Sequence, residues 1–381
     1  MRAIFLGLLL MLIAWPAVAQ TKAESAANCV GADLDTKIAG CTAMINAPDE
    51  SRDSWAIAYF NRGVGYQQQS KDQQAISDFS MALALSPDDA ETLSFRGWSY
   101  QRNRRADLAI ADYNKVIALD RNGLEPYWIS AYYNRGILNR DARRYDQAIA
   151  DLTAAIQREP SYLASAYYDR GLAYAWKREC DAAIADFNTA LGINAKMTNA
   201  YNNRGWCYNH VGLYDQAIAD FTRAIALNPD LYTAYELRGR AYNAQKHYDE
   251  AIADFTKVIA VKPDLGYVYD NRGYDYSTKG LYDQAIADFT KSIELSDGDA
   301  QAHNNRAWTY HLLGRDSEGL PDAEKAVALA PKNLHYVETR AEIYERVGRH
   351  DEAVLDYRAA LSLEADHQAA MDGLKRLQAT P

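Results

Sequence analysis

The chain has 381 residues, of which 48% are apolar and 24% charged, a balance that is normal for a folded protein and argues against a disordered one. Its formal net charge of −10 would repel phosphate backbones, and no lysine or arginine tract reverses that charge, so we expect no nucleic-acid partner. The 28 tyrosines far outnumber the 8 phenylalanines and 7 tryptophans, and rings with a polar tip suit half-exposed positions on packed helices.

Residues 1–19 are predicted to be a cleavable signal peptide. Arg2 supplies a positive charge, residues 4–15 are apolar but too few to span a bilayer comfortably, and Ala17-Val18-Ala19 has the small-x-small form of a cleavage site. We therefore expect a mature chain that begins at Gln20 and is exported, periplasmic or associated with the cell envelope. The alternative is an uncleaved membrane anchor. No later segment approaches the roughly 20 apolar residues of a transmembrane helix, so the mature chain should have none.

A nine-fold internal repeat fills most of the remaining chain. The phrase Arg-Gly-x-x-Tyr recurs, with alanine for glycine in the last two copies and asparagine for tyrosine in the third. Its small residue stands at Gly63, Gly97, Gly136, Gly171, Gly205, Gly239, Gly273, Ala307 and Ala341. The steps between copies are 34, 39 and 35 residues, then 34 five times, so each copy is one structural unit.

Each unit is predicted to be a helical hairpin. In the fifth unit, Tyr201, Gly205 and Tyr208 form one stripe at helical spacing, and a second stripe runs from Ala217 to Ile225. Residues 212–215 break the pattern between them, and the aspartate there is expected to cap the second helix. Prolines then close five of the units, because proline cannot continue a helix: Pro87, Pro160, Pro229, Pro263 and Pro331.

These residues resemble the tetratricopeptide repeat over residues 56–367. The fifth unit shows the match in order: Tyr201, Gly205, Tyr208, Ala217, Phe221, Ala224 and Pro229. The resemblance implies an all-α fold, an α-solenoid that forms a right-handed superhelix of about nine tetratricopeptide helical hairpins. It also implies protein binding in general, without naming a partner. The eighth unit departs most, with Gly319, Pro321 and Ala323, so its second helix is expected to start late or bend.

Both ends are predicted to cap the stack. Within the N-terminal cap, residues 20–55, the stretch 35–45 aligns with the second helix 215–225, so a half repeat precedes the first full unit. At the other end, residues 368–381 are expected to form a C-terminal capping helix and tail, with the helix over 368–378.

Two charged rows follow the repeat. Every unit has arginine just before its small residue and aspartate sixteen residues after the arginine, as in Arg238 and Asp254. One interpretation is a row of charges for an ionic ligand. The favoured one is a ladder of ion pairs that ties the helices together and fixes their register.

The four cysteines favour disulfides over metal or nucleophile roles, because the number is even and the chain is expected to be exported. We expect Cys29 and Cys41 to close a small loop in the N-terminal cap. Cys180 and Cys207 lie on helices that should touch, and the sequence leaves open whether they are bridged, since it does not show whether their Cβ atoms meet.

No recognisable catalytic constellation is present in the sequence: no His-Glu-x-x-His motif, no Gly-x-Ser-x-Gly elbow, no phosphate loop and no glycine-rich dinucleotide turn. His303 and His311 lie two helical turns apart, a weak metal signal that more often marks solvated or packing histidines. We therefore expect a protein that is not an enzyme and that carries no cofactor and no metal.

The expected binding surface is a stripe on the first helix of each hairpin, which by resemblance to the family lines the concave groove. It uses the positions three before, one after and four after the small residue. Rigid aromatics among amides suit a peptide groove, since they supply anchors and backbone hydrogen bonds. The alternative is that the tryptophans pack between adjacent first helices. The candidate residues are Trp98, Tyr133, Tyr168, Asn202, Trp206, Asn209, Glu236, Asn243, Asp270, Tyr274, Asn304, Trp308 and His311.

Two functions fit this sequence. The first is a scaffold or adaptor that binds a protein or peptide partner in the periplasm or cell envelope. The second is a non-catalytic subunit of an enzyme complex for envelope polymer synthesis or secretion. The insertion 123–129, where the period stretches to 39 residues, is either a contact loop or a longer turn. Family members that bind a C-terminal carboxylate use lysine and arginine in the groove, and that basic set is missing here.

Overall fold

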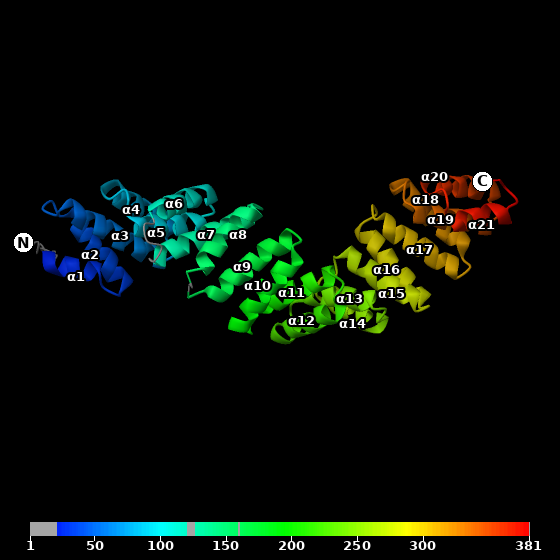
Figure 1. The fold of residues 1–381 in the computed structure, drawn as a ribbon, viewed down its shortest axis with the longest axis horizontal. Helices are drawn as coiled ribbons and strands as arrows, with labels where there is room; N and C mark the ends of the chain where they lie inside the picture. The colour runs from blue at the N-terminus through cyan, green and yellow to red at the C-terminus, as the bar shows by residue number, and fades with distance from the viewer. Residues whose placement is uncertain (1–20, 120–125, 159–160, 381) are drawn as a thin grey trace, which may run out of the picture. The chain divides into compact units, whose positions relative to one another are not determined.

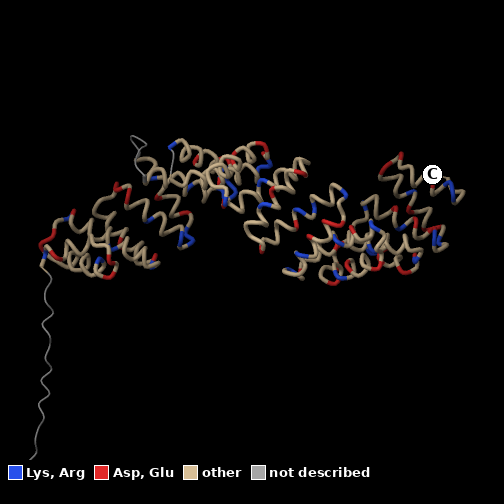
Figure 2. Tube along the Cα trace, turned by 90° about the horizontal axis from the view of Figure 1, so that it is seen from below, with Lys and Arg blue, Asp and Glu red and all other residues tan. Residues whose placement is uncertain are grey.

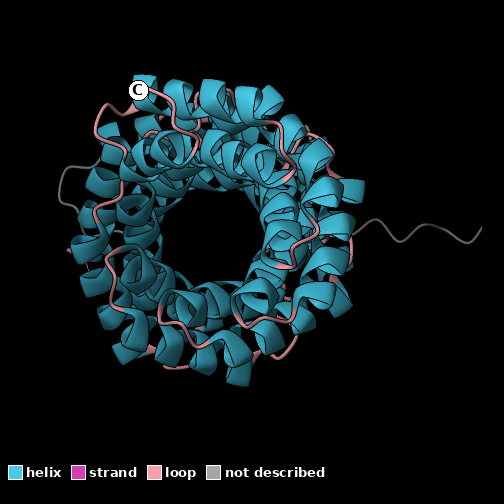
Figure 3. Ribbon diagram, turned by 90° about the vertical axis from the view of Figure 1, so that its right-hand side faces the viewer, coloured by secondary structure: helices cyan, strands magenta, loops and turns pink. Residues whose placement is uncertain are grey.

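The computed structural model describes residues 21–119, 126–158 and 161–380. Within these ranges every regular element is an α-helix, and short loops join the helices (Figures 1 and 3). The predicted signal peptide and residues 123–125 of the insertion lie outside the described residues. The described chain divides into unit 1, up to Ala173, and unit 2, from Tyr174. The predicted all-α fold of paired helices is therefore confirmed.

Unit 1 begins with a short hairpin and continues with full ones (Figure 1). Its helices are α1 (Lys22–Cys29), α2 (Leu34–Asn46), α3 (Arg52–Gln68), α4 (Asp72–Leu85), α5 (Ala90–Arg102), α6 (Ala106–Leu119), α7 (Pro126–Asp141), α8 (Tyr145–Ile156) and most of α9 (Leu163–Trp176). The half repeat expected before the first full unit corresponds to α2, and α1 adds a short helix in front of it. Residues 126–129 of the insertion form the first turn of α7, so this part extends a helix.

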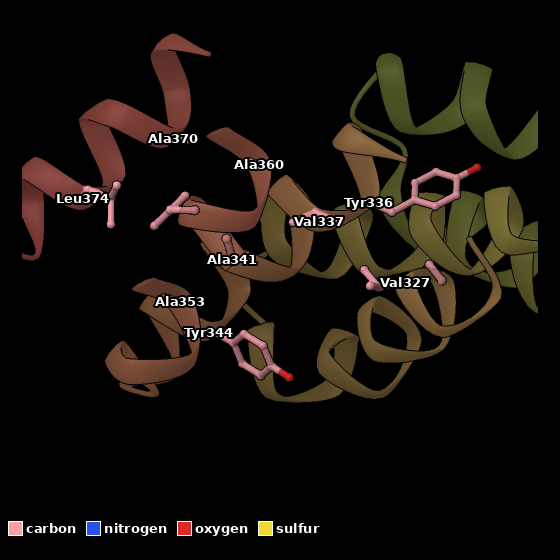
Figure 4. Packing of buried hydrophobic residues seen from close by; sticks show 11 residues of the cluster. Val327, Tyr336, Val337, Ala341, Tyr344, Ala353, Ala360, Ala370 and Leu374 are labelled. Atoms are coloured by element: carbon pink, nitrogen blue, oxygen red, sulfur yellow. The ribbon is translucent and has the colours of Figure 1, made fainter. Parts of the chain in front are cut away.

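Unit 2 contains the regular second half of the repeats. Its helices are α10 (Cys180–Ile193), α11 (Thr198–His210), α12 (Tyr214–Leu227), α13 (Tyr232–Ala244), α14 (Tyr248–Val261), α15 (Gly266–Thr278), α16 (Tyr282–Leu295), α17 (Ala300–Leu312), α18 (Asp316–Leu329), α19 (Leu334–Arg346), α20 (His350–Leu363) and α21 (Gln368–Arg376). The predicted C-terminal capping helix is α21, and Figure 4 shows its Leu374 with Val337 and Ala360 in the cluster that closes this end.

The first helix of each hairpin lies on the tighter side of its stack. Within each unit, Cα atoms of successive first helices approach within 8 Å, as between α15 and α17. Within either unit, none of the described second helices comes that close to the next second helix. We call the first-helix side of each unit its inner face, because the hairpins converge there.

Glycine lets the two helices of a hairpin meet across an aromatic ring. A Cβ atom on Gly205 would lie 2.8 Å from Cε1 of Phe221, and one on Gly239 would lie 2.9 Å from Cε1 of Phe255. Both rings are fully buried. In these hairpins a side chain in place of the glycine would collide with the ring, so the glycine allows the two helices to pack closely.

The arginine and aspartate rows form ion pairs, as the favoured interpretation predicted. In Arg238, Nε and Nη2 each donate to one carboxylate oxygen of Asp254 at 2.8 Å, and the aspartate is 5% exposed. The third nitrogen, Nη1, donates to Thr222 on the preceding hairpin at 2.9 Å. We call this three-residue contact the arginine clamp. Its bidentate ion pair recurs in Arg62–Asp78, Arg96–Asp112, Arg135–Asp151, Arg204–Asp220, Arg272–Asp288, Arg306–Asp322 and Arg340–Asp356.

The tyrosine excess follows from the arginine clamp. The rings of Tyr235 and Tyr242 lie 5.6 and 5.8 Å from the guanidinium carbon of Arg238, one turn before and one turn after it. The same arrangement recurs at Arg62, Arg204 and Arg272. Tyrosine suits these positions because its ring attracts the cation while its hydroxyl stays near water.

The expected capping role of the aspartate between the two helices is wrong. Helix α12 begins at Tyr214, and its N-cap, Leu213, makes no side-chain capping bond. Asp215 instead lies in the first turn, where a negative charge complements the helix dipole. Its carboxylate accepts a hydrogen bond from Gln245 of the next hairpin at 2.7 Å, so it joins neighbouring hairpins.

Repeat eight does not start its second helix late. Helix α18 begins at Asp316, nine residues after Ala307, the same offset as Tyr214 after Gly205 in repeat five. Pro321 is accommodated inside the helix. A Cβ atom on Gly319 would lie 2.9 Å from the carbonyl oxygen of Ala307. The glycine therefore sits on the second helix here and permits the close approach that a first-helix glycine permits elsewhere.

Only one of the two cysteine pairs is bonded. Cys29 and Cys41 form a disulfide between α1 and α2. Cys180 and Cys207 are buried free thiols, so the second bridge that the sequence left open is not formed in the structure. Burial, together with hydrogen bonding to Cys180, raises the pKa of the Cys207 thiol. The two side chains thus pack as small buried residues between α10 and α11.

Candidate protein-binding surface

The position after the small residue carries exposed aromatics on the inner face. Trp98, Tyr274 and Trp308 expose 41%, 48% and 37% of their surface, and Trp206 is half-buried. Each arises from the middle of a first helix, where the neighbouring glycine or alanine turns toward the second helix. These exposures do not fit side chains enclosed between adjacent first helices.

Each tryptophan is supported by a side chain about one turn later on its own helix. The guanidinium carbon of Arg102 lies 4.9 Å from the ring centre of Trp98. His210 stacks parallel to Trp206 with ring centres 5.4 Å apart, and His311 stacks on Trp308 at 5.0 Å. Such support limits the rotamers of the rings, which favours rigid anchors on an exposed face.

Most flanking candidates are engaged with the protein itself. The hydroxyl of Tyr133 donates to Asp169 at 2.7 Å, and Nδ2 of Asn243 donates to Asp275. Asp270 accepts a hydrogen bond from Asn305 at 3.0 Å. These contacts join successive first helices, so they set the spacing of the inner face.

The other flanking candidates differ in the ion pairs and hydrogen bonds that their side chains make. Glu236 pairs with Arg240 at 3.0 Å, and Nδ1 of His311 lies 2.6 Å from a carboxylate oxygen of Asp316. The amide oxygens of Asn202 and Asn304 are buried without a hydrogen-bond partner in the described structure. Tyr168 and Asn209 are half-buried on the same face.

Two clefts open between neighbouring first helices. One, of about 510 Å³, lies between α5 and α7 in unit 1 and is lined by Glu91, Ser94, Phe95, Trp98, Tyr127, Ser130 and Asn134. The other, of about 180 Å³, lies between α15 and α17 in unit 2 and is lined by Tyr274, Ser277, Thr278, Phe289, Asn305, Trp308 and Leu312. Each cleft combines an exposed tryptophan with hydroxyl and amide groups, which suits a side chain and an adjoining backbone.

Carboxylates of unit 2 lie close to this surface. Burial raises the pKa of Asp270 to about 6 and that of Asp275 to about 7. Burial also raises the pKa of Glu342, and the nearby carboxylates of Glu338 and Glu345 add to that rise. Burial thus disfavours the charged form of these three carboxylates. Figure 2 shows acidic and basic residues interspersed along the described trace.

Sequence reasoning missed Asp275, Asp169 and Glu342. Asp275 is fully buried, and one of its oxygens has no partner in the described structure. It stands two residues after Gly273, a position at which the other repeats have glycine, serine, leucine, alanine, cysteine, threonine or isoleucine. A charged residue in a row of uncharged residues was the available signal.

The described residues offer neither a metal site nor a membrane-spanning helix. They contain no group of three or more histidine, cysteine, aspartate or glutamate side chains placed to hold a metal ion. No helix among them is long and apolar enough to cross a membrane. Their exposed aromatic face is thus the strongest candidate for function.

Stacked two-helix units of this kind define the α-solenoid class. Models of the tetratricopeptide repeat match residues 90–122, 133–198, 198–231, 232–265, 271–334 and 336–367, well over half of the chain. The chain therefore belongs to the tetratricopeptide-repeat family. This fold suggests a scaffold for protein–protein interaction, and proteins built from it are generally non-catalytic.

The fold is similar to those of several solved structures, three of which are identified by their source organism. A tetratricopeptide repeat protein from Parabacteroides merdae is 21% identical, covering 65% of this chain and 97% of that chain with a TM-score of 0.49. The pilF protein of Pseudomonas aeruginosa is 20% identical, covering 56% and 95% with a TM-score of 0.47. Yeast Tom70 is 16% identical, covering 91% and 93% with a TM-score of 0.41. No curated protein sequence matches the chain.

Proposed function

We propose that the protein is a non-catalytic adaptor that binds a polypeptide along the inner face of its first helices. The observation that carries the proposal is the exposure of aromatics beside the clefts, Trp98 in unit 1 and Tyr274 and Trp308 in unit 2. A partner that covered these rings would remove a large apolar area from water, and tryptophan is enriched among the residues that dominate binding energy.

We place its action in the periplasm or cell envelope as part of the same proposal. The cleavage pattern of residues 1–19 supports export. A disulfide between Cys29 and Cys41 is consistent with an oxidising compartment. Mass spectrometry of the periplasmic fraction should find a chain that begins at Gln20, and a mature pool that retains Met1 would contradict this placement.

The binding role is tested with Trp206 and Trp308 replaced together by alanine. Peptides selected by the wild-type chain from a displayed random library serve as ligands, and affinity is measured by fluorescence anisotropy. Loss of a hot-spot tryptophan costs about 2 kcal/mol or more of binding, so the selected peptides should bind the variant at least about 30-fold more weakly. Circular dichroism melting should change little, because neither side chain is fully buried.

Leu355→Ala is the matched control. Leu355 lies on the second helix α20 and is 64% exposed, so its loss should leave both affinity and melting unchanged. Unchanged affinity in the folded double variant would refute the binding surface. Unfolding of the double variant would indicate that the two tryptophans pack within the fold and are needed for its stability.

A further inference from the structure

Trp98 and Trp308 occupy the same position in their first helices but differ in what covers them. Arg102, four residues after Trp98, places its guanidinium over that ring. The residue four after Trp308 is Leu312, which is 44% exposed. Among the described residues, no lysine or arginine lies over the ring of Trp308 or of Tyr274. Trp98 thus has a guanidinium over its ring, whereas Trp308 has the imidazole of His311 stacked on its ring and no lysine or arginine.

The cleft between α15 and α17 has room for about one large side chain. Tyr274 and Trp308 both line it, and Ser277, Thr278 and Asn305 contribute polar groups. Aromatic faces attract cations because of their negative π-clouds, and this attraction strengthens when water is excluded. A cleft with two such rings and neutral hydrogen-bonding groups is suited to the extended stem and charged head of lysine or arginine.

Carboxylates stand on both sides of this cleft along the inner face. Asp270 lies one turn before Tyr274 on α15, and Glu342 on α19 occupies the position in repeat nine that Trp308 occupies in repeat eight. The side chain of Glu342 is 26% exposed, and Nε2 of His311 is 3.7 Å from its carboxylate. No lysine or arginine forms an ion pair with Glu342 in the described structure.

The basic residues on these first helices are already committed. Arg272, Arg306 and Arg340 hold their aspartates in ion pairs. Arg240 pairs with Glu236, and Arg346 lies 3.6 Å from Asp316. None of these arginines pairs with Glu342.

We propose that the inner face of unit 2 selects a polypeptide segment with basic side chains, and that one lysine or arginine enters the cleft between Tyr274 and Trp308, near Glu342. This inference rests on the proposed function and specifies its ligand. Charge complementarity supports the choice of occupant, because a cation there gains both ring and carboxylate attraction. The unit 1 cleft, whose Trp98 already has Arg102, carries no such preference.

The test uses the full mature chain and three capped nonapeptides in which serine alternates with arginine, citrulline or glutamate. Citrulline keeps the shape of arginine without its charge. Binding is followed by fluorescence anisotropy at low and at physiological salt. The arginine peptide should bind at least about tenfold more tightly than the citrulline peptide, and added salt should reduce that difference.

Three variants locate the effect. Trp308→Ala and Glu342→Gln should each weaken binding of the arginine peptide about tenfold or more. The Glu342→Gln variant should bind the citrulline peptide nearly as tightly as the wild-type chain does. Trp98→Ala in unit 1 is the matched control and should retain the preference for arginine. Glu342→Gln preserves size and hydrogen-bonding shape, so it remains informative if Trp308→Ala destabilises the fold.

The outcomes separate this inference from the proposed function. If arginine and citrulline peptides bind equally and both depend on Trp308, the inner face binds peptides but the basic preference is overturned. If the arginine preference persists in both Trp308→Ala and Glu342→Gln, the charge acts elsewhere and the cleft assignment is overturned. If no peptide responds to Trp308, both the inference and the binding surface fail.

Discussion

The interior of the hairpins and the inner face are made by the same repeating unit. The interior contacts stay the same from repeat to repeat, whereas the side chains of the inner face differ. Inside the hairpins the same contacts return, with a glycine against a ring and an arginine clamp around an aspartate. One residue after the glycine, the side chain changes from Trp206 to Arg240, Tyr274, Trp308 and Glu342. Stability is thus supplied by recurring positions, which leaves the exposed row free to differ between repeats.

The largest effect that would sharpen this comparison is expected from Arg238→Ala. The change leaves the carboxylate of Asp254, 5% exposed, without its partner, and removal of one partner of a buried ion pair costs about 3 to 5 kcal/mol. Urea unfolding followed by circular dichroism measures the loss. Arg240→Ala, two residues away, is the control. Its pair with Glu236 involves an arginine side chain that is 48% exposed, so about 1 kcal/mol or less is expected. Equal losses in the two variants would contradict the division between hairpin interior and exposed face.

An intermediate effect is expected from Gly205→Ala. The new Cβ atom would lie 2.8 Å from the ring of Phe221, and overpacking of a buried contact costs about 1 to 3 kcal/mol. Gly192→Ala in α10 is the matched control, because nothing lies within 4 Å of its Cβ position. There the substitution should stabilise the chain by roughly 0.5 to 1 kcal/mol, since alanine loses less entropy in a helix. Thermal melting should therefore shift in opposite directions, and shifts in the same direction would show that the ring does not require glycine.

The change expected from Asp275→Asn depends on pH. Burial raises the pKa of Asp275 from 3.8 to about 7, so between these values the folded chain keeps a proton that the unfolded chain has released. Wild-type stability should then fall as pH rises through this range, by at most about 1.4 kcal/mol per pH unit for one proton. The variant lacks this contribution, so its advantage in melting temperature should grow from pH 5 to pH 8. Asp264→Asn, at an exposed residue, should show no such growth. A constant difference would mean that Asp275 is ionised throughout.

Much of the hairpin interior could be predicted from the sequence because its contacts repeat. Gly205, Phe221 and the pair Arg238 and Asp254 recur at fixed offsets, so one period reveals each contact several times. The N-cap assignment of Asp215 failed because the helix starts at Tyr214, two residues earlier than a cap at Asp215 requires. An apolar stripe does not define a helix boundary to within one or two residues.

The inner face could be predicted only in part. The sequence placed Trp98, Tyr274 and Trp308 on one stripe, and the structure shows all three substantially exposed. It did not show that Asn243 and Asp270 would bond to the next first helix. Those bonds depend on the offset between successive hairpins, which periodicity within one unit does not define. The same limit applies to Cys180 and Cys207, whose helices meet without forming a bridge.

The arginine clamp has a consequence for how such a chain can change in length. Arg238 reaches Thr222 sixteen residues before it and Asp254 sixteen residues after it, and Arg272 does the same with Thr256 and Asp288. Excision of one 34-residue period, such as residues 230–263, would therefore bring Thr222 to the position that Thr256 now holds relative to Arg272. The new junction would inherit a complete set of partners without any compensating substitution. A gene encoding this chain can thus gain or lose whole repeats by recombination and still specify a stack in which neighbouring hairpins contact each other. Each gain or loss changes the order of the exposed side chains that a partner would contact.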